Sequence, residues 1–452
     1  VFKSSLSAYV MILATLTVEE HVFEMHELYK KINKWTQMSF DARHIKRMKS
    51  VLLISVCLLF SLYVINVIGA VELLREVLGG RRYLNVLWLF LFSYAFLNWK
   101  GIDWTLFKLY SWVIIPVIVT CLFLYFYHDC SFDLSYAKYV ILFLLAGSIC
   151  SNIKSFNLRK FFVIGALSCI VIFFVALYQI YVLDYLVPNG DLNQNIFASM
   201  AMIIGSATFF AYLYPCFHSV ERFVYALCGS LAIWVALRTT CRTAYVTELI
   251  LCFLFLYLAR IKLHWALKES IFFVFLISLS MYFVIIFSPA EAEQKFSVIL
   301  KQIFDFFDLN AKETTSSSIG LRLAMWKAAI LDVIPNHFLF GLGDIRRCDW
   351  LRLITGSSID PTFLRTLRHF HNEGINIFVT GGLLLFLVSN WLLYQLFQAA
   401  RGEPVLLCLL VGSVSWGITE VAFFHKNYFF VFLSLWLLYE CALYNEHRRS
   451  NL

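Results

Sequence analysis

Long apolar runs recur along most of this chain, and they constrain its fold more than any other feature of the sequence. A helix needs about 20 mostly apolar residues to cross a bilayer, because its rise must cover the hydrocarbon core. Twelve segments meet this requirement, and the second, seventh and eighth are the shortest. They lie at 51–72, 83–99, 104–127, 135–152, 160–186, 195–217, 221–238, 243–260, 270–288, 374–398, 403–422 and 427–445. The sequence therefore predicts an all-α polytopic membrane protein with about 12 transmembrane helices.

The composition agrees with a membrane-embedded chain, since 61% of its 452 residues are hydrophobic and only 15% are charged. Soluble domains are roughly half apolar and a quarter charged. The net charge of +8 does not require a nucleic-acid partner, because cytoplasmic loops of membrane proteins collect Lys and Arg. Most cysteines lie inside apolar runs and none form a CxxC pair, which argues against a zinc or thioredoxin-like site.

Short loops rich in Lys and Arg indicate which side of the membrane is cytoplasmic. The basic segments are the leading segment, the loops 153–160 and 260–268, and the tail. With twelve spans these four fall on one side, which we take as cytoplasmic, although the basic loop 73–82 falls on the other. The predicted organisation is an N-terminal cytoplasmic or interfacial segment at 1–50, spans within 51–288, an external loop at 289–373, spans within 374–445 and a cytoplasmic tail at 446–452.

The external loop at 289–373 is long enough to hold structure of its own. Two apolar stripes at helical spacing predict two amphipathic helices in it, which would lie on the membrane surface or cover the bundle. The second stripe runs along Leu323, Trp326, Ile330 and Val333. Ser318 is a candidate N-cap for this helix, and Pro335 is expected to end it.

Three arginines are predicted to lie at the external face. Arg238 and Arg242 stand four residues apart with threonines between them, and Arg322 begins the second amphipathic helix. Guanidinium groups bind phosphate oxygens in bidentate fashion, and helix N-termini also attract phosphate. The alternatives are arginines that snorkel to the interface and an Arg322 on a solvated helix face.

His371 stands where the loop re-enters the membrane, and it is the candidate for proton transfer. A neutral imidazole can take a proton from a hydroxyl near pH 7, and the adjacent Asn372 and Glu373 are positioned in sequence to orient it. His369 forms a His-x-His pair with His371, but no carboxylate or Cys follows at standard ligand spacing. We therefore expect no metal and no cofactor, and a structural interfacial histidine is the alternative.

Two further polar residues fall on the same face. Glu420 lies near the end of a span, where an acid is costly and usually has a functional partner, here one of the arginines or a sugar hydroxyl. A carboxylate that simply faces water is the alternative. Asn195, which follows Asn193 and Gln194, is expected to hydrogen-bond a sugar, whereas ordinary capping by Asn193 is the other interpretation.

Four short motifs, in this order, resemble the bacterial O-antigen ligase family within the wider group of O-antigen polymerases and ligases. They are Thr240-Cys241-Arg242-Thr243-Ala244, Ser318-x-Gly320-x-Arg322-Leu323-Ala324-Met325, His369-x-His371-Asn372-Glu373 and Gly417-Ile418-Thr419-Glu420-Val421. Gly382 stands where the family has a glycine after its His-Asn pair, and the long loop after the ninth span matches the family layout. The chain departs from the family at Leu385, where a small residue is common, and at Glu420, where Asp is common.

The resemblance implies a fold and a reaction. The fold would be a GT-C-like glycosyltransferase bundle in the bacterial inner membrane, with its site on the periplasmic face. An undecaprenyl-pyrophosphate-linked glycan would be the donor and a sugar hydroxyl of the lipid A core the acceptor, joined without metal and with inversion. Arg242 and Arg322 would hold the pyrophosphate, and His371 would position or deprotonate the acceptor hydroxyl. The residues expected to bind substrate are Arg238, His369, Asn372, Glu420 and Asn195.

Two alternative functions fit parts of the sequence. An O-antigen polymerase or a protein O-oligosaccharyltransferase would use the same donor with a different acceptor. A lipid or polysaccharide transporter belongs to another class and would make no covalent bond. Transporters place charges near the bilayer midplane at broken helices, whereas the charges of this chain cluster at one face.

Overall fold

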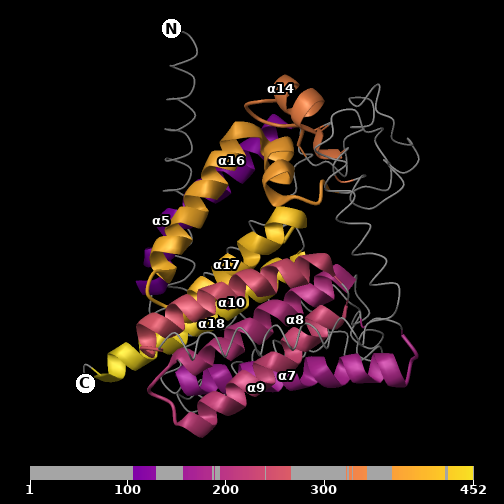
Figure 1. Cartoon of the computed structure of the whole chain (residues 1–452). Coiled ribbons are helices and arrows are strands. Elements are labelled where there is room, and N and C mark those ends of the chain that lie inside the picture. The colour runs from indigo at the N-terminus through magenta and orange to yellow at the C-terminus, as the bar shows by residue number, and fades with distance from the viewer. Residues whose placement is uncertain are drawn as a thin grey trace, which may run out of the picture.

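The computed structural model describes residues 105–128, 156–185, 188, 194–239, 241–265, 322, 325–327, 329–343, 369–422 and 426–450. Within these ranges every regular element is helical (Figure 1). The elements are α5 (Thr105–Tyr127), α7 (Leu158–Tyr181), α8 (Gln194–Phe209), η2 (Phe210–Leu213), α9 (Ser219–Arg238), α10 (Arg242–Lys262), η3 (Ala329–Val333), α14 (Ile334–Asn336), α16 (Glu373–Ala400), α17 (Pro404–Thr419) and α18 (Lys426–Ser450).

The described helices form a multi-pass membrane protein. Five of them, in the part of the chain that the structure describes, are long and apolar enough to cross a bilayer: Leu158–Tyr181, Gln194–Leu213, Ser219–Arg238, Thr243–Lys262 and Glu373–Ala400. Shorter apolar helices span Ile115–Tyr127 and Pro404–Ile418. The predicted spans at 51–72, 83–99, 135–152 and 270–288, the segment 1–50 and most of the loop at 289–373 lie outside the described residues, so the twelve-span arrangement stays a prediction.

Helix α8 forms the centre of the bundle. Its apolar window is 83% buried, against 17% for α16, because α7, α9 and α17 pack around it. Small residues permit this packing: a Cβ on Gly229 of α9 would lie 2.6 Å from the carbonyl oxygen of Gly205 on α8. Close backbone contact at small residues is a common way to pack helices within lipid, where no hydrophobic force drives association.

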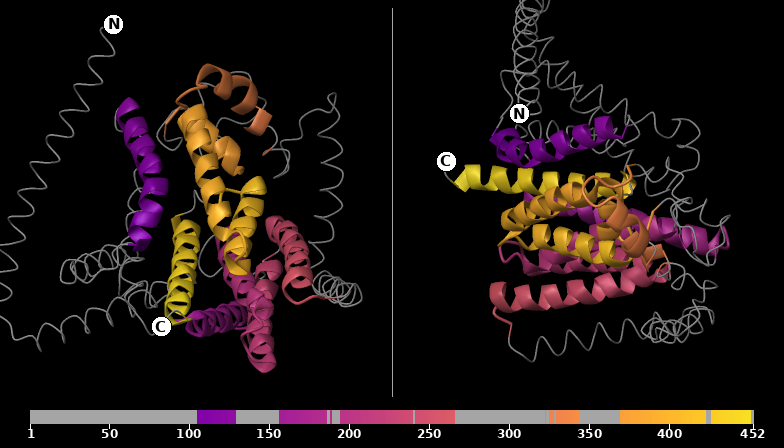
Figure 2. Two further views of the ribbon diagram at one scale, coloured as in Figure 1. Left: turned by 90° about the vertical axis from the view of Figure 1, so that its left-hand side faces the viewer. Right: turned by 90° about the horizontal axis from the view of Figure 1, so that it is seen from above.

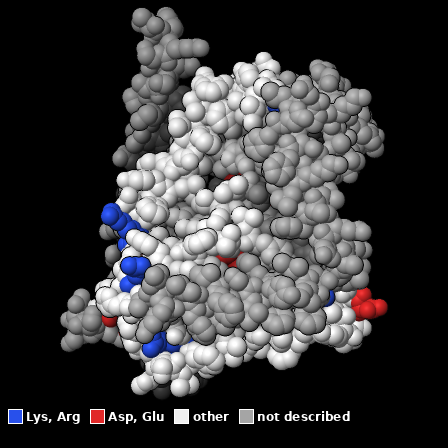
Figure 3. Space-filling model, viewed as in Figure 1, with Lys and Arg blue, Asp and Glu red and all other residues white. Residues whose placement is uncertain are grey.

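The helices alternate in direction, so their ends gather at two opposite faces. Arg159 at the start of α7 pairs with Glu221 at the start of α9, with Nε and Oε1 3.1 Å apart. The start of α8, the start of α16 and the end of α17 meet at the other face, where the side chains of Asn195 and His371 both contact Glu420. Figure 3 shows that much of the described surface carries no charged residue, as expected for a surface in contact with lipid.

Helix α16 is broken at Gly382, and residues 338–342 of the preceding loop dock onto the break. Gly382 has φ +63° and ψ −162°, so the helical hydrogen-bond ladder is interrupted there. The amides of Leu342 and Leu383 bond across the break, to the carbonyl oxygens of Val379 (2.7 Å) and Phe338 (2.8 Å). A Cβ on Gly382 would lie 2.4 Å from backbone atoms of Leu339, so this position requires glycine by its φ and by its close approach. The orange segment beside α16 in Figure 2 is this docked part of the loop.

The second amphipathic helix differs in detail from the sequence prediction. Its last turns are a π-helical turn, η3, and the short α14, rather than regular α-helix. The helix ends at Asn336, one residue after the predicted Pro335. Proline disturbs a helix at such a position because it lacks the N–H that would bond four residues back. The predicted N-cap, Ser318, lies outside the described residues.

Candidate functional site

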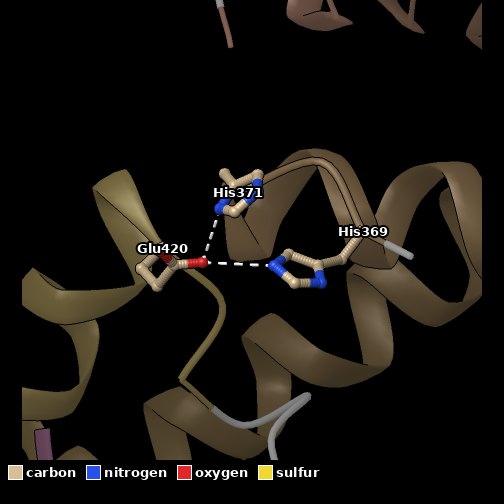
Figure 4. Close-up of side chains that lie close together, drawn as sticks. All are labelled: His369, His371 and Glu420. Atoms are coloured by element: carbon tan, nitrogen blue, oxygen red, sulfur yellow. Dashed lines mark hydrogen bonds and ion pairs between the residues drawn. The ribbon is translucent and has the colours of Figure 1, made fainter. Parts of the chain in front are cut away.

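The candidate site is built around the carboxylate of Glu420, which follows the last residue of α17 and is 2% exposed. One oxygen, Oε1, lies 2.7 Å from Nδ1 of His371 and 3.3 Å from Nε2 of His369 (Figure 4). The other, Oε2, lies 2.9 Å from Nδ2 of Asn195 and 3.2 Å from Nη2 of Arg322. A buried carboxylate is costly unless it is paired and hydrogen-bonded, and these four donors meet that need.

Local backbone structure aims these side chains at one another. Glu420 is extended (φ −148°, ψ 176°), so its side chain leaves the axis of α17 at the end of the helix. His371 has φ +51°, a left-handed conformation that costs an L-residue roughly 1–2 kcal/mol. Asn372 caps α16 by accepting the amide of Ile375 at 2.9 Å, and it donates to the carbonyl of Ile418 at 2.8 Å. The cap therefore ties the start of α16 to the end of α17.

The two ionisable partners have shifted pKa values. Burial on its own would raise the pKa of Glu420, but hydrogen bonds from His369 and His371 and the charge of Arg322 outweigh it and hold the pKa well below its ordinary range. Burial lowers the pKa of His371, and although Glu420 opposes this effect, the net shift is downward. At neutral pH the pair is thus an ionised glutamate and a neutral histidine.

This charge state fixes the tautomer of His371. An ionised carboxylate has no proton to donate, so Nδ1 of His371 must carry the proton that bonds Oε1 of Glu420. Nε2 then bears the lone pair and can accept a proton. A carboxylate that holds an imidazole in this way is the usual means of orienting a general base.

The structure gives fewer contacts for the two arginines near the start of α10 than for Arg322. Arg238 ends α9, and its Nη1 is buried without a hydrogen-bond partner among the described residues. Arg242 is the first residue of α10, but its side chain lies outside what the structure describes. Burial raises the pKa of the preceding thiol, Cys241, and the charge of Glu420 adds to this effect, which indicates that the start of α10 lies close to the site.

The middle of the chain matches a known family. Residues 227–389 match the family model described as O-antigen ligase. This part of the chain is therefore similar to the O-antigen ligase family. The matched segment includes Arg238, Arg242, Arg322 and His371, whereas Asn195 and Glu420 lie outside it. No curated protein matches the chain.

The sequence predicted which residues lie at this site better than it predicted which of them contact one another. The structure brings together Arg322, His369, His371, Asn195 and Glu420, all of them candidates from the sequence. The carboxylate on Nδ1 of His371 is that of Glu420 and not that of the adjacent Glu373. Asn195 donates to Glu420, and both polar side-chain atoms of Asn372 bond within the protein, so for Asn372 the geometry favours a positioning role over substrate contact.

His369, His371 and Glu420 also offer ligand atoms within 4.8 Å of one another, which is close enough for one metal ion. The expectation of no metal rested on spacing along the chain, and the fold supplies a carboxylate that this spacing did not reveal. A metal would need lone pairs on the nitrogens that here donate N–H bonds to Glu420, and the charge of Arg322 on the same carboxylate opposes a second cation. Metal binding and the hydrogen-bonded arrangement are therefore mutually exclusive.

Two further residues form hydrogen bonds at this site that the sequence analysis did not predict. Trp326, predicted only as part of an apolar stripe, donates from Nε1 to the carbonyl oxygen of Phe370 at 2.6 Å. Asn376, in the first turn of α16, is 1% exposed and accepts the amide of Phe370 at 3.4 Å. A lone Asn among apolar residues was the available signal for the second; nothing in the sequence distinguished the N–H of Trp326.

Proposed function

We propose that this protein is an O-antigen ligase, which transfers a glycan from undecaprenyl pyrophosphate to a sugar hydroxyl of the lipid A core. The observation that carries the proposal is the Glu420–His371 pair beside Arg322, since it combines a general base with a positive charge. The similarity of residues 227–389 to the O-antigen ligase family supports the donor class.

In the proposed reaction, the acceptor hydroxyl attacks the anomeric carbon of the donor glycan. The bond from that carbon to the pyrophosphate oxygen breaks, and the configuration inverts. Nε2 of His371 takes the hydroxyl proton, while Nδ1 stays bonded to Glu420. The charge of the resulting imidazolium is balanced by the ionised carboxylate, whose pKa is already low. General-base catalysis of this kind contributes about 10²–10⁴-fold in rate.

The leaving undecaprenyl pyrophosphate gains negative charge, and arginines would stabilise it. A guanidinium has five N–H donors, so a contact of Arg322 with Glu420 through Nη2 is compatible with a further contact to phosphate. Arg242 would supply a second guanidinium. Arg238 would supply a third, and its Nη1, buried without a partner among described residues, is suited to a bound anion. Fixed positive groups of this kind replace a metal ion in stabilising the developing charge.

The proposed location is the inner membrane of a bacterium, with the site at the periplasmic face. Both substrates are lipid-anchored, so they would reach the site from the outer leaflet. The amphipathic part of the loop, which docks onto α16 at Gly382, would guide them.

A gene deletion tests the proposal against its nearest alternative. Loss of a ligase should leave polymerised glycan on undecaprenyl pyrophosphate, whereas loss of a polymerase should leave single repeats. If the deletion leaves lipopolysaccharide unchanged but a normally glycosylated protein loses its glycan, the protein is instead a protein O-oligosaccharyltransferase.

A point variant tests the chemistry itself. His371→Ala should abolish long-chain lipopolysaccharide on immunoblots while the protein still inserts in the membrane. Normal long-chain lipopolysaccharide in these cells would refute the assignment of His371 as the base. It would also favour a transporter, because transport alone needs no proton acceptor.

A further inference from the structure

The backbone around the two histidines is held by a pair of hydrogen bonds to a single buried residue, Phe370. Its side chain is 1% exposed, and it lies between His369 and His371 in the chain. Its amide donates to Oδ1 of Asn376 at 3.4 Å, and its carbonyl oxygen accepts from Nε1 of Trp326 at 2.6 Å. Each bond therefore holds one of the two peptide groups of Phe370.

These two peptide groups are the ones that orient the histidines. The amide of Phe370 belongs to the peptide that follows His369, and its carbonyl belongs to the peptide that precedes His371. The tilt of the second peptide sets φ of His371, which is +51°. Such a conformation persists in an L-residue only where the surroundings hold it. On its other side, His371 is followed by Asn372, which is fixed to the carbonyl of Ile418 at 2.8 Å.

We infer that Trp326 and Asn376 are positioning residues that hold His371 in the geometry needed for transfer. Trp326 comes from the second amphipathic helix, four residues after Arg322. This helix therefore supplies both the guanidinium that pairs with Glu420 and one bond of the clamp, by which we mean the two hydrogen bonds that hold Phe370. Docking of the loop thereby sets the direction of the catalytic imidazole. The expected loss of activity rests on the proposed function, whereas the hydrogen bonds that hold Phe370 do not depend on it.

The test is Trp326→Phe, which removes the N–H donor and keeps an aromatic ring. Trp265→Phe is the matched control, because Trp265 follows the end of α10 that lies away from Arg242 and packs against Tyr212 and Phe255. Both proteins, full-length in lipid nanodiscs, are assayed with undecaprenyl-pyrophosphate-linked glycan and lipid A core. For Trp326→Phe we expect kcat to fall about 100-fold, as for a misplaced catalytic group, with KM for the donor within about threefold. The control should keep the kcat of the native protein.

Hydrogen–deuterium exchange supplies a readout that does not depend on activity. In Trp326→Phe the amides of residues 369–372 should exchange about five- to tenfold faster, as loss of one hydrogen bond implies. Asn376→Leu should do the same, while Asn390→Leu, which removes an exposed amide further along α16, should not. Unchanged exchange in Trp326→Phe, or equal loss of kcat and thermal stability in both tryptophan variants, would overturn the inference. If the native protein transfers no glycan from this donor, the proposed function fails, and the exchange data still decide whether the clamp exists.

Discussion

Replacing Glu420 with glutamine is the most direct test of the site, because it preserves size and removes the charge. Four side chains donate N–H bonds to this carboxylate, those of His369, His371, Asn195 and Arg322, and the backbone amide of Val421 adds a longer bond at 3.4 Å. A carboxylate accepts from all four side chains through its two oxygens. The amide of glutamine has one oxygen, and its NH₂ group would face two N–H donors to which it cannot bond. At least two of the four bonds are therefore lost. Removing one partner of a buried ion pair costs about 3–5 kcal/mol.

The functional effect of Glu420→Gln follows from the tautomer of His371. If the new NH₂ group faces Nδ1, that nitrogen must accept, so the proton moves to Nε2 and the base is no longer available. We expect kcat to fall by about 10²–10⁴-fold, the range that general-base catalysis supplies. The assay is single-turnover glycan transfer with the purified variant in nanodiscs, saturated with lipid-linked donor.

The same substitution at the other end of α17 is the control. Glu403 precedes α17 and accepts the hydroxyl of Tyr439 at 2.6 Å, far along the helix from His371. Glu403→Gln should keep the native kcat. A Glu420→Gln protein that folds and turns over within about threefold of the native rate would refute the role given to the carboxylate.

The acid–base state of the site, its metal independence and the break in α16 can each be tested separately. Because His371 acts as a neutral base and burial lowers its pKa from the ordinary value, kcat should be flat from neutral pH upward and fall only as acid protonates the imidazole; a profile still rising above pH 7 would contradict this. Activity should survive dialysis against EDTA, since the ring nitrogens of His369 and His371 that face Glu420 donate N–H bonds to it and have no lone pair to offer a metal there; complete loss restored by Mg²⁺ would overturn the metal-free mechanism. Gly382→Ala should lower the melting temperature by several degrees, since a Cβ would lie 2.4 Å from Leu339 backbone and φ is +63°; Gly402→Ala, with φ +111° but open space around it, separates the clash from the strain.

Hydropathy along the chain was sufficient to predict the helical architecture in the described ranges. Apolar runs at 221–238 and 243–260, two of the shortest, are present as α9 and α10. These patterns are local, because each helix must satisfy its own backbone hydrogen bonds within lipid. The break at Gly382 was not predicted as a break, since a single glycine in an apolar run does not show that another segment will dock against it.

The sequence by itself determined which charged and polar residues lie near the membrane face, where burial costs free energy unless each group has a partner. Arg322, His371 and Glu420 were singled out for that reason, because the polarity of each side chain is known from the sequence alone. Only the tertiary structure decided which groups pair, because Glu420 lies 49 residues from His371 and 225 from Asn195. Hydrogen bonds act over about 3 Å, so the tautomer of His371 and the clamp on Phe370 exist only once the loop and the helix ends have been brought together.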